Sequence, residues 1–272
     1  MRAQSAAPAA AAAPEVSLQR LTGADAGIVM LTLNRPATKN ALGKQLMHDF
    51  RAALTELQFD TSARVVIVNS AVPGGFCSGA DLKERVAMSS TEVAAFVHGL
   101  RSAFTQLQNL PQPTIAAIDG AAFGGGLELA LSCDLRVAGK DAKLGLTETA
   151  LAIIPGAGGT QRMSRLIGAS KAKELVFTAR RLSSVDALAY GIVNHAVDSA
   201  HAKALDIARE IVPNGPVALR MAKRAIDLGA QGDITSGMVV EELCYAQTIP
   251  TKDRLEGLAA FKEKRKPVYR GE

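Results

Sequence analysis

The chain has 272 residues, 48% hydrophobic and 21% charged, which is enough to bury a sizeable core as one large domain or two smaller ones. Its net charge of +5 permits an anionic partner without identifying one, and the 4% aromatic content leaves few stacking platforms for single-stranded nucleic acid. No apolar run reaches the roughly 18 residues that a membrane-spanning helix needs, so we expect no membrane partner.

The opening segment, residues 1–14, is rich in alanine and proline, contains Arg2 and lacks acidic residues. This composition favours a disordered tail. It also permits the remnant of a mitochondrial targeting peptide, although a single arginine is little support for one. Residues 1–14 are therefore interpreted as a disordered tail or a targeting remnant.

Strands and helices alternate over the next part of the chain. Apolar runs predict strands at 16–20, 28–33, 64–69, 114–118, 135–137 and 143–146. Apolar residues at helical spacing predict helices at 42–57 and 91–109, and a further helix at 127–132. This alternation predicts an α/β fold with a largely parallel sheet.

The pattern becomes almost wholly helical from residue 159 onward. Helices are expected at 159–167, 169–177, 183–189, 200–212, 215–229, 234–248 and 251–265, with one strand at 192–196. The shift near residue 200 predicts a core over residues 15–199 that carries the active site, followed by a helical region over residues 200–272.

Common nucleotide and hydrolase signatures are missing from the sequence, which contains neither G-x-G-x-x-G, nor a P-loop, nor G-x-S-x-G. The three cysteines are far apart and show no CxxC spacing, so reduced, buried thiols are expected. This suits an intracellular compartment. The four histidines form no metal-binding pair, and we expect no metal site.

Three loops carry the remaining chemistry: F-C-S-G-A-D-L-K-E at 76–84, A-F-G-G-G-L-E-L at 122–129 and T-E-T-A-L-A-I-I-P-G-A-G-G-T-Q-R at 147–162. Glycines at a strand-to-helix junction let the backbone approach a ligand closely. Two of these loops could each aim a backbone N–H at one carbonyl oxygen and form an oxyanion hole.

Two glutamates belong to these loops and suggest acid–base chemistry. Glu128 and Glu148 would bring two carboxyl groups to one glycine-lined cleft, as a general acid/base pair requires. Taken singly, each has another explanation. Glu128 fits a first-turn acid that complements the helix dipole, and Glu148 fits a solvated surface glutamate.

All three loops, together with D-R-L-E-G-L-A-A-F-K-E-K-R at 253–265, resemble the enoyl-CoA hydratase/isomerase (crotonase) superfamily from about residue 16 to the C-terminus. Three tracts look most like its mitochondrial methylglutaconyl-CoA hydratase branch: F-C-S-G-A-D-L-K-E-R, A-F-G-G-G-L-E-L-A-L and C-Y-A-Q-T-I-P-T-K-D-R-L-E-G. That branch includes members that bind AU-rich RNA and an enoyl-CoA hydratase domain-containing relative. The resemblance implies a crotonase-like spiral of ββα units and a helical C-terminal trimerisation region. The expected assembly is a homotrimer or a dimer of trimers.

The resemblance also implies site residues and a reaction. Ala80 and Gly125 match the two oxyanion N–H donors, Glu128 and Glu148 match the catalytic carboxylates, and Lys83, Phe261 and Lys264 match residues that contact coenzyme A (CoA), the last two often from a neighbouring subunit. Two glutamates favour hydration over a double-bond shift. The expected activity is enoyl-CoA hydration, as in fatty acid β-oxidation, with no cofactor beyond the CoA of the substrate.

Three alternatives remain open from the sequence. A specific 3-methylglutaconyl-CoA hydratase of leucine catabolism would need a basic or polar group deep in the acyl pocket, and the sequence does not show which residue supplies it. A non-catalytic CoA-ester-binding protein would not need both glutamates. RNA binding is not favoured, because Lys44 and Arg51 are offset by Asp49 and Glu56 in the helix at 42–57. The branch implies the mitochondrial matrix in a eukaryote, and otherwise the cytoplasm.

Overall fold

The computed structural model describes residues 13–272. Its largest sheet has six strands in the order β1-β2-β3-β5-β7-β10. The strands are β1 (Val16–Arg20), β2 (Ile28–Leu33), β3 (Val65–Ser70), β5 (Thr114–Ile118), β7 (Leu135–Gly139) and β10 (His195–Val197). Only the β1–β2 pair is antiparallel, so the predicted, largely parallel sheet is confirmed.

A second sheet of four short strands lies beside the first, in the order β4-β6-β8-β9. Its members are β4 (Gly75–Cys77), β6 (Ala121–Phe123), β8 (Lys143–Gly145) and β9 (Leu182–Ser183). The chain adds β3 and then β4, β5 and then β6, β7 and then β8, one strand to each sheet, with helices between successive pairs. The expected spiral of ββα units is therefore present.

Helices cover both faces of the larger sheet. On one face α1 (Lys44–Phe59) and α3 (Ser90–Gln108) bury aliphatic side chains and the Phe50–Phe104 pair against the strands. On the other face α8 (Ala200–Ile211) packs its small residues on alternate strand positions. This two-sided burial explains why the central strands are uniformly apolar.

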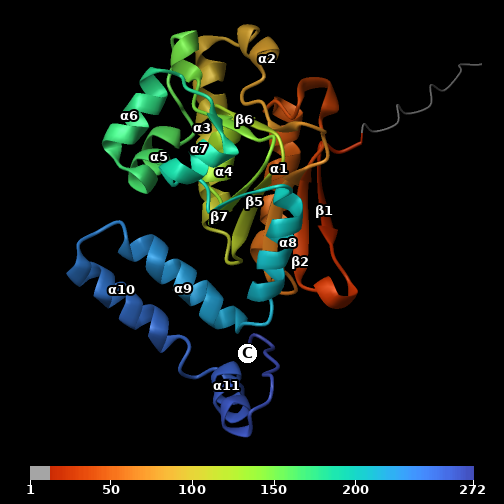
Figure 1. The fold of residues 1–272 in the computed structure, drawn as a ribbon, viewed down its shortest axis with the longest axis vertical. Helices are drawn as coiled ribbons and strands as arrows, with labels where there is room; N and C mark the ends of the chain where they lie inside the picture. Colours follow the sequence, from red (N-terminus) through yellow and green to blue (C-terminus); the bar gives the residue numbers. More distant parts are fainter. Residues whose placement is uncertain (1–12) are drawn as a thin grey trace, which may run out of the picture.

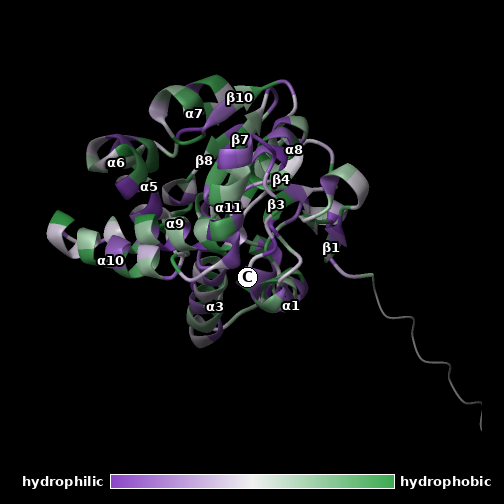
Figure 2. Cartoon of the chain, turned by 90° about the horizontal axis from the view of Figure 1, so that it is seen from below, coloured by the Kyte–Doolittle hydropathy of each residue, from purple (hydrophilic) through white to green (hydrophobic). Residues whose placement is uncertain are grey.

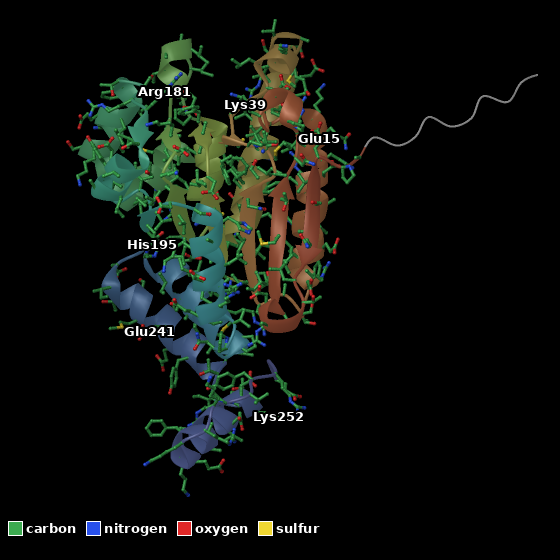
Figure 3. All side chains as sticks on the ribbon, turned by 45° about the vertical axis from the view of Figure 1, so that its right-hand side comes forward. Glu15, Lys39, Arg181, His195, Glu241 and Lys252 are labelled. Atoms are coloured by element: carbon green, nitrogen blue, oxygen red, sulfur yellow. The ribbon has the colours of Figure 1, made fainter. Side chains whose placement is uncertain are left out.

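Most of the short elements lie at one end of the molecule. They are η2 (Pro36–Thr38), α2 (Leu82–Val86), α4 (Gly125–Leu131), η3 (Glu148–Leu151), α5 (Gly159–Ile167), α6 (Ala169–Phe177) and α7 (Ser184–Tyr190), whereas η1 (Gly23–Asp25) forms the turn between β1 and β2. Glu15 and Lys39 lie at this end, whereas Lys252 lies at the opposite end (Figure 3). The three loops singled out in the sequence belong to this group of elements.

The last helices extend away from the sheets (Figure 1). They are α9 (Pro216–Gly229), α10 (Ile234–Ala246) and α11 (Lys252–Glu263), with α9 and α10 side by side. Hydrophobic segments of α10 lie at the periphery of the molecule (Figure 2). Because α8 packs on the sheet whereas α9 to α11 project from it, the departure from the core begins after α8. The division at residue 200 stays a prediction.

Most predicted elements are confirmed to within a few residues, and the differences have simple causes. The helix expected at 42–57 begins at Lys44, because Leu42 forms an isolated bridge with Ala80. The strand expected at 192–196 pairs only from His195 onward. The three cysteines are free and buried. Within residues 13–272 no helix is long and apolar enough to cross a membrane. The interpretation of residues 1–14 falls almost wholly outside the described residues.

Candidate active site

A cavity of about 120 Å³ lies between α2, α3, α4 and the loop that follows η3. Ala80, Gly125, Glu128 and Glu148 all line it. Four residues that are up to 68 positions apart in the sequence therefore share one small space. The two carboxyl groups and the two oxyanion candidates that the sequence suggested do meet in the fold.

The loop that carries Ala80 is fixed on both sides by backbone hydrogen bonds. The Leu42 N–H donates to the Gly79 carbonyl at 2.7 Å, and the Asp81 N–H donates to the Leu42 carbonyl at 3.3 Å. The Ala80 N–H between them has no acceptor among residues 13–272. Pairing of its neighbours thus leaves this one donor free at the cavity wall.

Ion pairs between Arg35 and three carboxylates also fix the loop that carries Ala80. Asp81 is 7% exposed and accepts hydrogen bonds from the N–H groups of Lys83 and Glu84, which starts α2. Its other oxygen accepts from Arg35 Nη1 at 2.7 Å, and Arg35 also reaches Glu15 and Glu84. A half-buried guanidinium with three carboxylate partners holds the residue next to Ala80 in place.

The junction between β6 and α4 presents the second free donor. Gly124 has φ of +50°, a conformation that residues with a Cβ rarely adopt, and it turns the chain into the helix. Gly125 is the first residue of α4, so its N–H has no partner within the helix. A Cβ at Gly125 would lie 2.7 Å from Leu42 Cδ1 and 3.9 Å from the Ala80 nitrogen.

Glu128 lies in the first turn of α4 and is 2% exposed. Its Oε1 accepts hydrogen bonds from the N–H groups of Ala157 at 2.8 Å and Gly159 at 2.7 Å. Burial raises the pKa of Glu128 above its ordinary value, and these two donors oppose that rise by stabilising the carboxylate. The carboxyl group is therefore held in one orientation by the glycine-rich loop before α5.

Glu148, the first residue of η3, has a different environment. Both of its carboxyl oxygens are buried, and neither accepts a hydrogen bond from the described residues. Burial, followed by the nearby charge of Glu128, raises the pKa of Glu148 to about 7. Two neighbouring carboxyl groups with different hydrogen bonding are suited to opposite protonation states at neutral pH.

The residues expected to contact CoA are not gathered in the same way. Lys83 is exposed on α2, next to Leu82, which lines the cavity. Phe261 is 87% exposed on α11 and Lys264 directly follows that helix. Since α2 and α11 lie at opposite ends of the molecule (Figure 1), the single chain does not bring these residues together. Their roles stay predictions.

The sequence reasoning missed three residues that the structure places at the site. Ala157 and Gly159 supply the donors to Glu128, and Arg85 lines the same cavity. The run of glycines at 156–159 was the available signal for the first two. Within residues 13–272 no cluster of His, Cys, Asp or Glu side chains is arranged to hold a metal.

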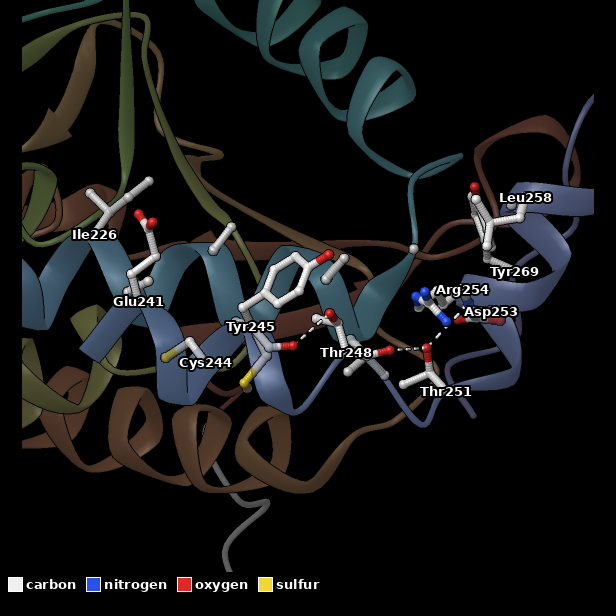
Figure 4. Close-up of a pocket in the computed structure, with 17 residues that line it drawn as sticks. Ile226, Glu241, Cys244, Tyr245, Thr248, Thr251, Asp253, Arg254, Leu258 and Tyr269 are labelled. Carbon is white, nitrogen blue, oxygen red and sulfur yellow. Dashed lines mark hydrogen bonds between the residues drawn. The ribbon is translucent and has the colours of Figure 1, made fainter. Parts of the chain in front are cut away.

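A second, larger cavity of about 730 Å³ lies between α9, α10 and α11. Figure 4 shows Glu241 and Tyr245 of α10 on one side of it, and Leu258 and Tyr269 on the other. Its walls are mostly apolar, and of the two carboxyl residues that line it, Glu241 and Asp253, the second already accepts the N–H groups of Arg270 and Gly271. Size alone therefore does not mark it as the site of chemistry.

Comparison with known proteins identifies the family. The enoyl-CoA hydratase/isomerase family matches residues 23–272. The chain belongs to this family. It is 55% identical over 264 residues to the mitochondrial methylglutaconyl-CoA hydratase of Homo sapiens, covering 95% of this chain and 78% of that protein. It is 54% identical to the probable mitochondrial enoyl-CoA hydratase 2 of Arabidopsis thaliana, over 94% of this chain and 86% of that protein.

A solved structure supports the same conclusion for this member of the enoyl-CoA hydratase/isomerase family. The enoyl-CoA hydratase of Bacillus anthracis superposes with a TM-score of 0.92 at 48% sequence identity, covering 95% of this chain and all of that one. The crotonase-like fold is thereby confirmed. Relatives at about 55% identity support an enzyme of the hydro-lyase class.

Proposed function

We propose that the protein is an enoyl-CoA hydratase, which adds water across the 2,3-double bond of an enoyl-CoA thioester to give a 3-hydroxyacyl-CoA. The observation that carries the proposal is the meeting of two buried carboxyl groups and two unpaired backbone N–H groups in one cavity. The family and its named hydratases supply independent support.

The free N–H groups of Ala80 and Gly125 would stabilise the negative charge that develops on the thioester oxygen. Attack of water at C3 pushes electrons through C2 onto that oxygen and forms an enolate. Donors that are already oriented stabilise this charge without reorganisation, and losing one such donor costs about 3–4 kcal/mol of barrier height. Because both donors belong to the backbone, the fold of each loop determines their position.

The two glutamates would move the protons. Glu128, oriented as a carboxylate by its two N–H donors, takes a proton from the attacking water as the oxygen bonds to C3. Glu148, with its pKa raised to about 7, gives a proton to C2. Water supplies both the hydroxyl group and, through exchange at the two carboxyls, the new hydrogen. The two carboxyl groups carry both protons and the backbone donors stabilise the enolate, so the proposed steps use no group beyond these residues, water and the substrate.

The assembly is proposed from the exposed apolar surface of the C-terminal helices. Met238, Leu243 and Leu258 are each more than half exposed on α10 and α11. Large apolar side chains that stay exposed on consecutive helices are what a subunit interface would cover. A homotrimer or dimer of trimers would cover it, and Phe261 with Lys264 would then contact CoA from a neighbouring subunit. Light scattering on the purified protein measures the assembly, and Leu258→Glu is expected to weaken it.

Pathway and compartment are proposed on the names of the relatives. Several are mitochondrial methylglutaconyl-CoA hydratases, which suggests leucine catabolism in the mitochondrial matrix if the chain is eukaryotic. Fractionation of cells that express the tagged chain measures the compartment. The expectation that the protein does not bind RNA, drawn from the balanced charges near Lys44 and Arg51, stays a prediction, and salt-dependent retention on an AU-rich oligonucleotide at physiological ionic strength would contradict it.

The function is tested by following the loss of enoyl absorbance with a panel of enoyl-CoA thioesters of different chain length. Enzymatic hydration of at least one of them, with the 3-hydroxyacyl-CoA identified by mass spectrometry, is the expected result. Absence of turnover across the panel, with the protein folded and binding CoA esters, would support a non-catalytic CoA-ester-binding protein instead. A double-bond shift in place of hydration would also contradict the proposal.

A further inference from the structure

Arg85 places a positive charge on the wall of the proposed acyl cavity. It lies on α2, three residues after Leu82, so both side chains project from the same face of the helix. Both line the cavity together with Glu128 and Glu148. The guanidinium carbon lies 5.2 Å from the centre of the Phe96 ring, which supports the side chain without using any of its hydrogen-bond donors.

No carboxylate among residues 13–272 forms an ion pair with Arg85. The nearby carboxylates have other partners. Glu84 accepts hydrogen bonds from Arg35 and from the Lys44 N–H, and Glu128 accepts one from the Ala157 N–H in the loop before α5. Burial lowers the pKa of Arg85, with no opposing charge to offset it. An arginine nevertheless remains protonated at any physiological pH. The cavity therefore contains a cation whose hydrogen-bond donors are unused.

The rest of this part of the wall is apolar. Val97 and Leu100 from α3 surround the same space, together with Leu151 of η3 and with Ile153 and Ile154 from the loop after it. A plain alkyl chain needs only such contacts. Partial removal of a guanidinium from water is unfavourable unless an anion or acceptor compensates for it. The combination suits a ligand that is apolar along its length and negatively charged at its end.

We propose that Arg85 binds a carboxylate at the distal end of the acyl chain. The preferred substrates are then dicarboxylic enoyl thioesters of the glutaconyl type, of which 3-methylglutaconyl-CoA is one. The proposal rests on the hydratase function above and names the substrate class of that same site. A planar guanidinium can donate two parallel N–H···O hydrogen bonds to a carboxylate, so it fixes the orientation of that carboxylate as well as neutralising its charge.

The kinetic test compares crotonyl-CoA with glutaconyl-CoA, which differ by the terminal carboxylate. Arg85→Gln is expected to lower kcat/KM for glutaconyl-CoA about 50-fold while changing that for crotonyl-CoA less than about threefold. Arg85→Lys should retain part of the preference. Arg165→Gln, which removes the same charge from the exposed surface of α5, is the matched control and should change neither value. An equal effect of Arg85→Gln on both substrates would overturn the proposal.

A binding measurement separates this proposal from the hydratase function. Glutaryl-CoA and butyryl-CoA have no double bond, so their dissociation constants from calorimetry do not depend on turnover. Wild-type protein should bind glutaryl-CoA at least about tenfold more tightly than butyryl-CoA, and Arg85→Gln should abolish the difference. If no enoyl-CoA is hydrated but wild-type protein still binds glutaryl-CoA more tightly than butyryl-CoA, the hydratase function is refuted and the role of Arg85 is not. Equal binding of the two esters by wild-type protein, or equal weakening of both by Arg85→Gln, would refute the role of Arg85.

Discussion

Glu128 and Glu148 face one cavity, but only Glu128 is hydrogen-bonded. Its Oε1 accepts two backbone N–H groups, at 2.8 and 2.7 Å, whereas both oxygens of Glu148 are buried without a donor among the described residues. The charge of Glu128 adds to burial in raising the pKa of Glu148 to about 7. This asymmetry assigns the base to Glu128 and the acid to Glu148 in the proposed reaction.

Glu128→Gln and Glu148→Gln should each lower kcat for enoyl-CoA hydration by about a factor of 10² to 10⁴, the usual contribution of one acid–base group. Glutamine keeps the size of the side chain but cannot exchange the proton. Binding of a saturated acyl-CoA should change little, because neither carboxyl is proposed to hold CoA. Steady-state kinetics and calorimetry on the two variants measure both quantities. Wild-type turnover in either variant would remove that residue from the mechanism.

Activity should fall as pH rises through about 7, because Glu148 then loses the proton that it donates. The acidic side of the profile should fall as Glu128, whose pKa is also raised, becomes protonated. The pH dependence of kcat/KM reports both groups in the free enzyme. Glu148→Gln should lose the fall on the alkaline side in its residual activity. A wild-type rate that is constant from about pH 6 to about pH 9 would contradict the assignment.

The same shift predicts how stability depends on pH. The native state raises the pKa of Glu148 from 4.5 to about 7, so it favours the protonated carboxyl, and that stabilisation is lost as pH rises between these values. Allowing for partial exposure, Glu148→Gln should be more stable than wild type by about 1–2 kcal/mol at pH 8 and not at pH 4. Urea unfolding at both pH values measures the difference. A variant that is less stable at pH 8 would show that Glu148 is not strained by burial.

Gly125→Ala should damage the site in two separable ways. The added Cβ would lie 2.7 Å from Leu42 Cδ1, an overlap that should destabilise the protein by about 1–3 kcal/mol. It would also lie 3.9 Å from the Ala80 nitrogen, in the space that a thioester oxygen needs, and kcat should fall about 10²-fold. Leu42→Val removes the overlapping atom, so the double variant should regain stability without activity. If the double variant regains both stability and kcat, Gly125 is needed only to avoid the overlap with Leu42 and not to leave room for the thioester oxygen.

Arg35→Met should lower both stability and activity, because it leaves Asp81 buried without its ion pair beside Ala80. Breaking such a pair costs about 3 kcal/mol, and a less rigid loop should lower kcat about tenfold. The control is Arg180→Met, whose ion pair with Glu174 is nearly half exposed and should contribute less than about 1 kcal/mol. Thermal unfolding and hydration rates test the pair of variants. If Arg35→Met and Arg180→Met lower stability and activity equally, Arg35 does not hold the loop beside Ala80 in place.

Much of the architecture could be predicted because long periodic segments determine it. The strand at 114–118 and the helices at 159–167 and 169–177 have the predicted bounds. Of the second sheet only the strand at 143–146 was predicted, since strands such as Gly75–Cys77 and Ala121–Phe123 are too short to show alternation. These short strands pair with each other because β3 and β5, the strands that precede them in the chain, already lie side by side in the larger sheet.

The site was predictable only in part, for a related reason. The glycine loops indicated where free N–H groups would lie, but the contact of Glu128 with Ala157 and Gly159 spans about thirty residues and leaves no local pattern. Arg85 sits in a single helical turn rich in charged residues, which resembles a solvated surface in the sequence. Its place in the cavity wall, against the Phe96 ring of α3, depends on the tertiary fold and leaves no mark in the sequence.

The central claim concerns where the thioester oxygen binds, and a crystal structure of the complex with butyryl-CoA measures this directly. We predict that the oxygen lies roughly 2.7–3.1 Å from the nitrogens of both Ala80 and Gly125, with C3 beside the carboxyl groups of Glu128 and Glu148. A thioester bound elsewhere, or an oxygen held by side chains while the two backbone donors face away, would contradict the account.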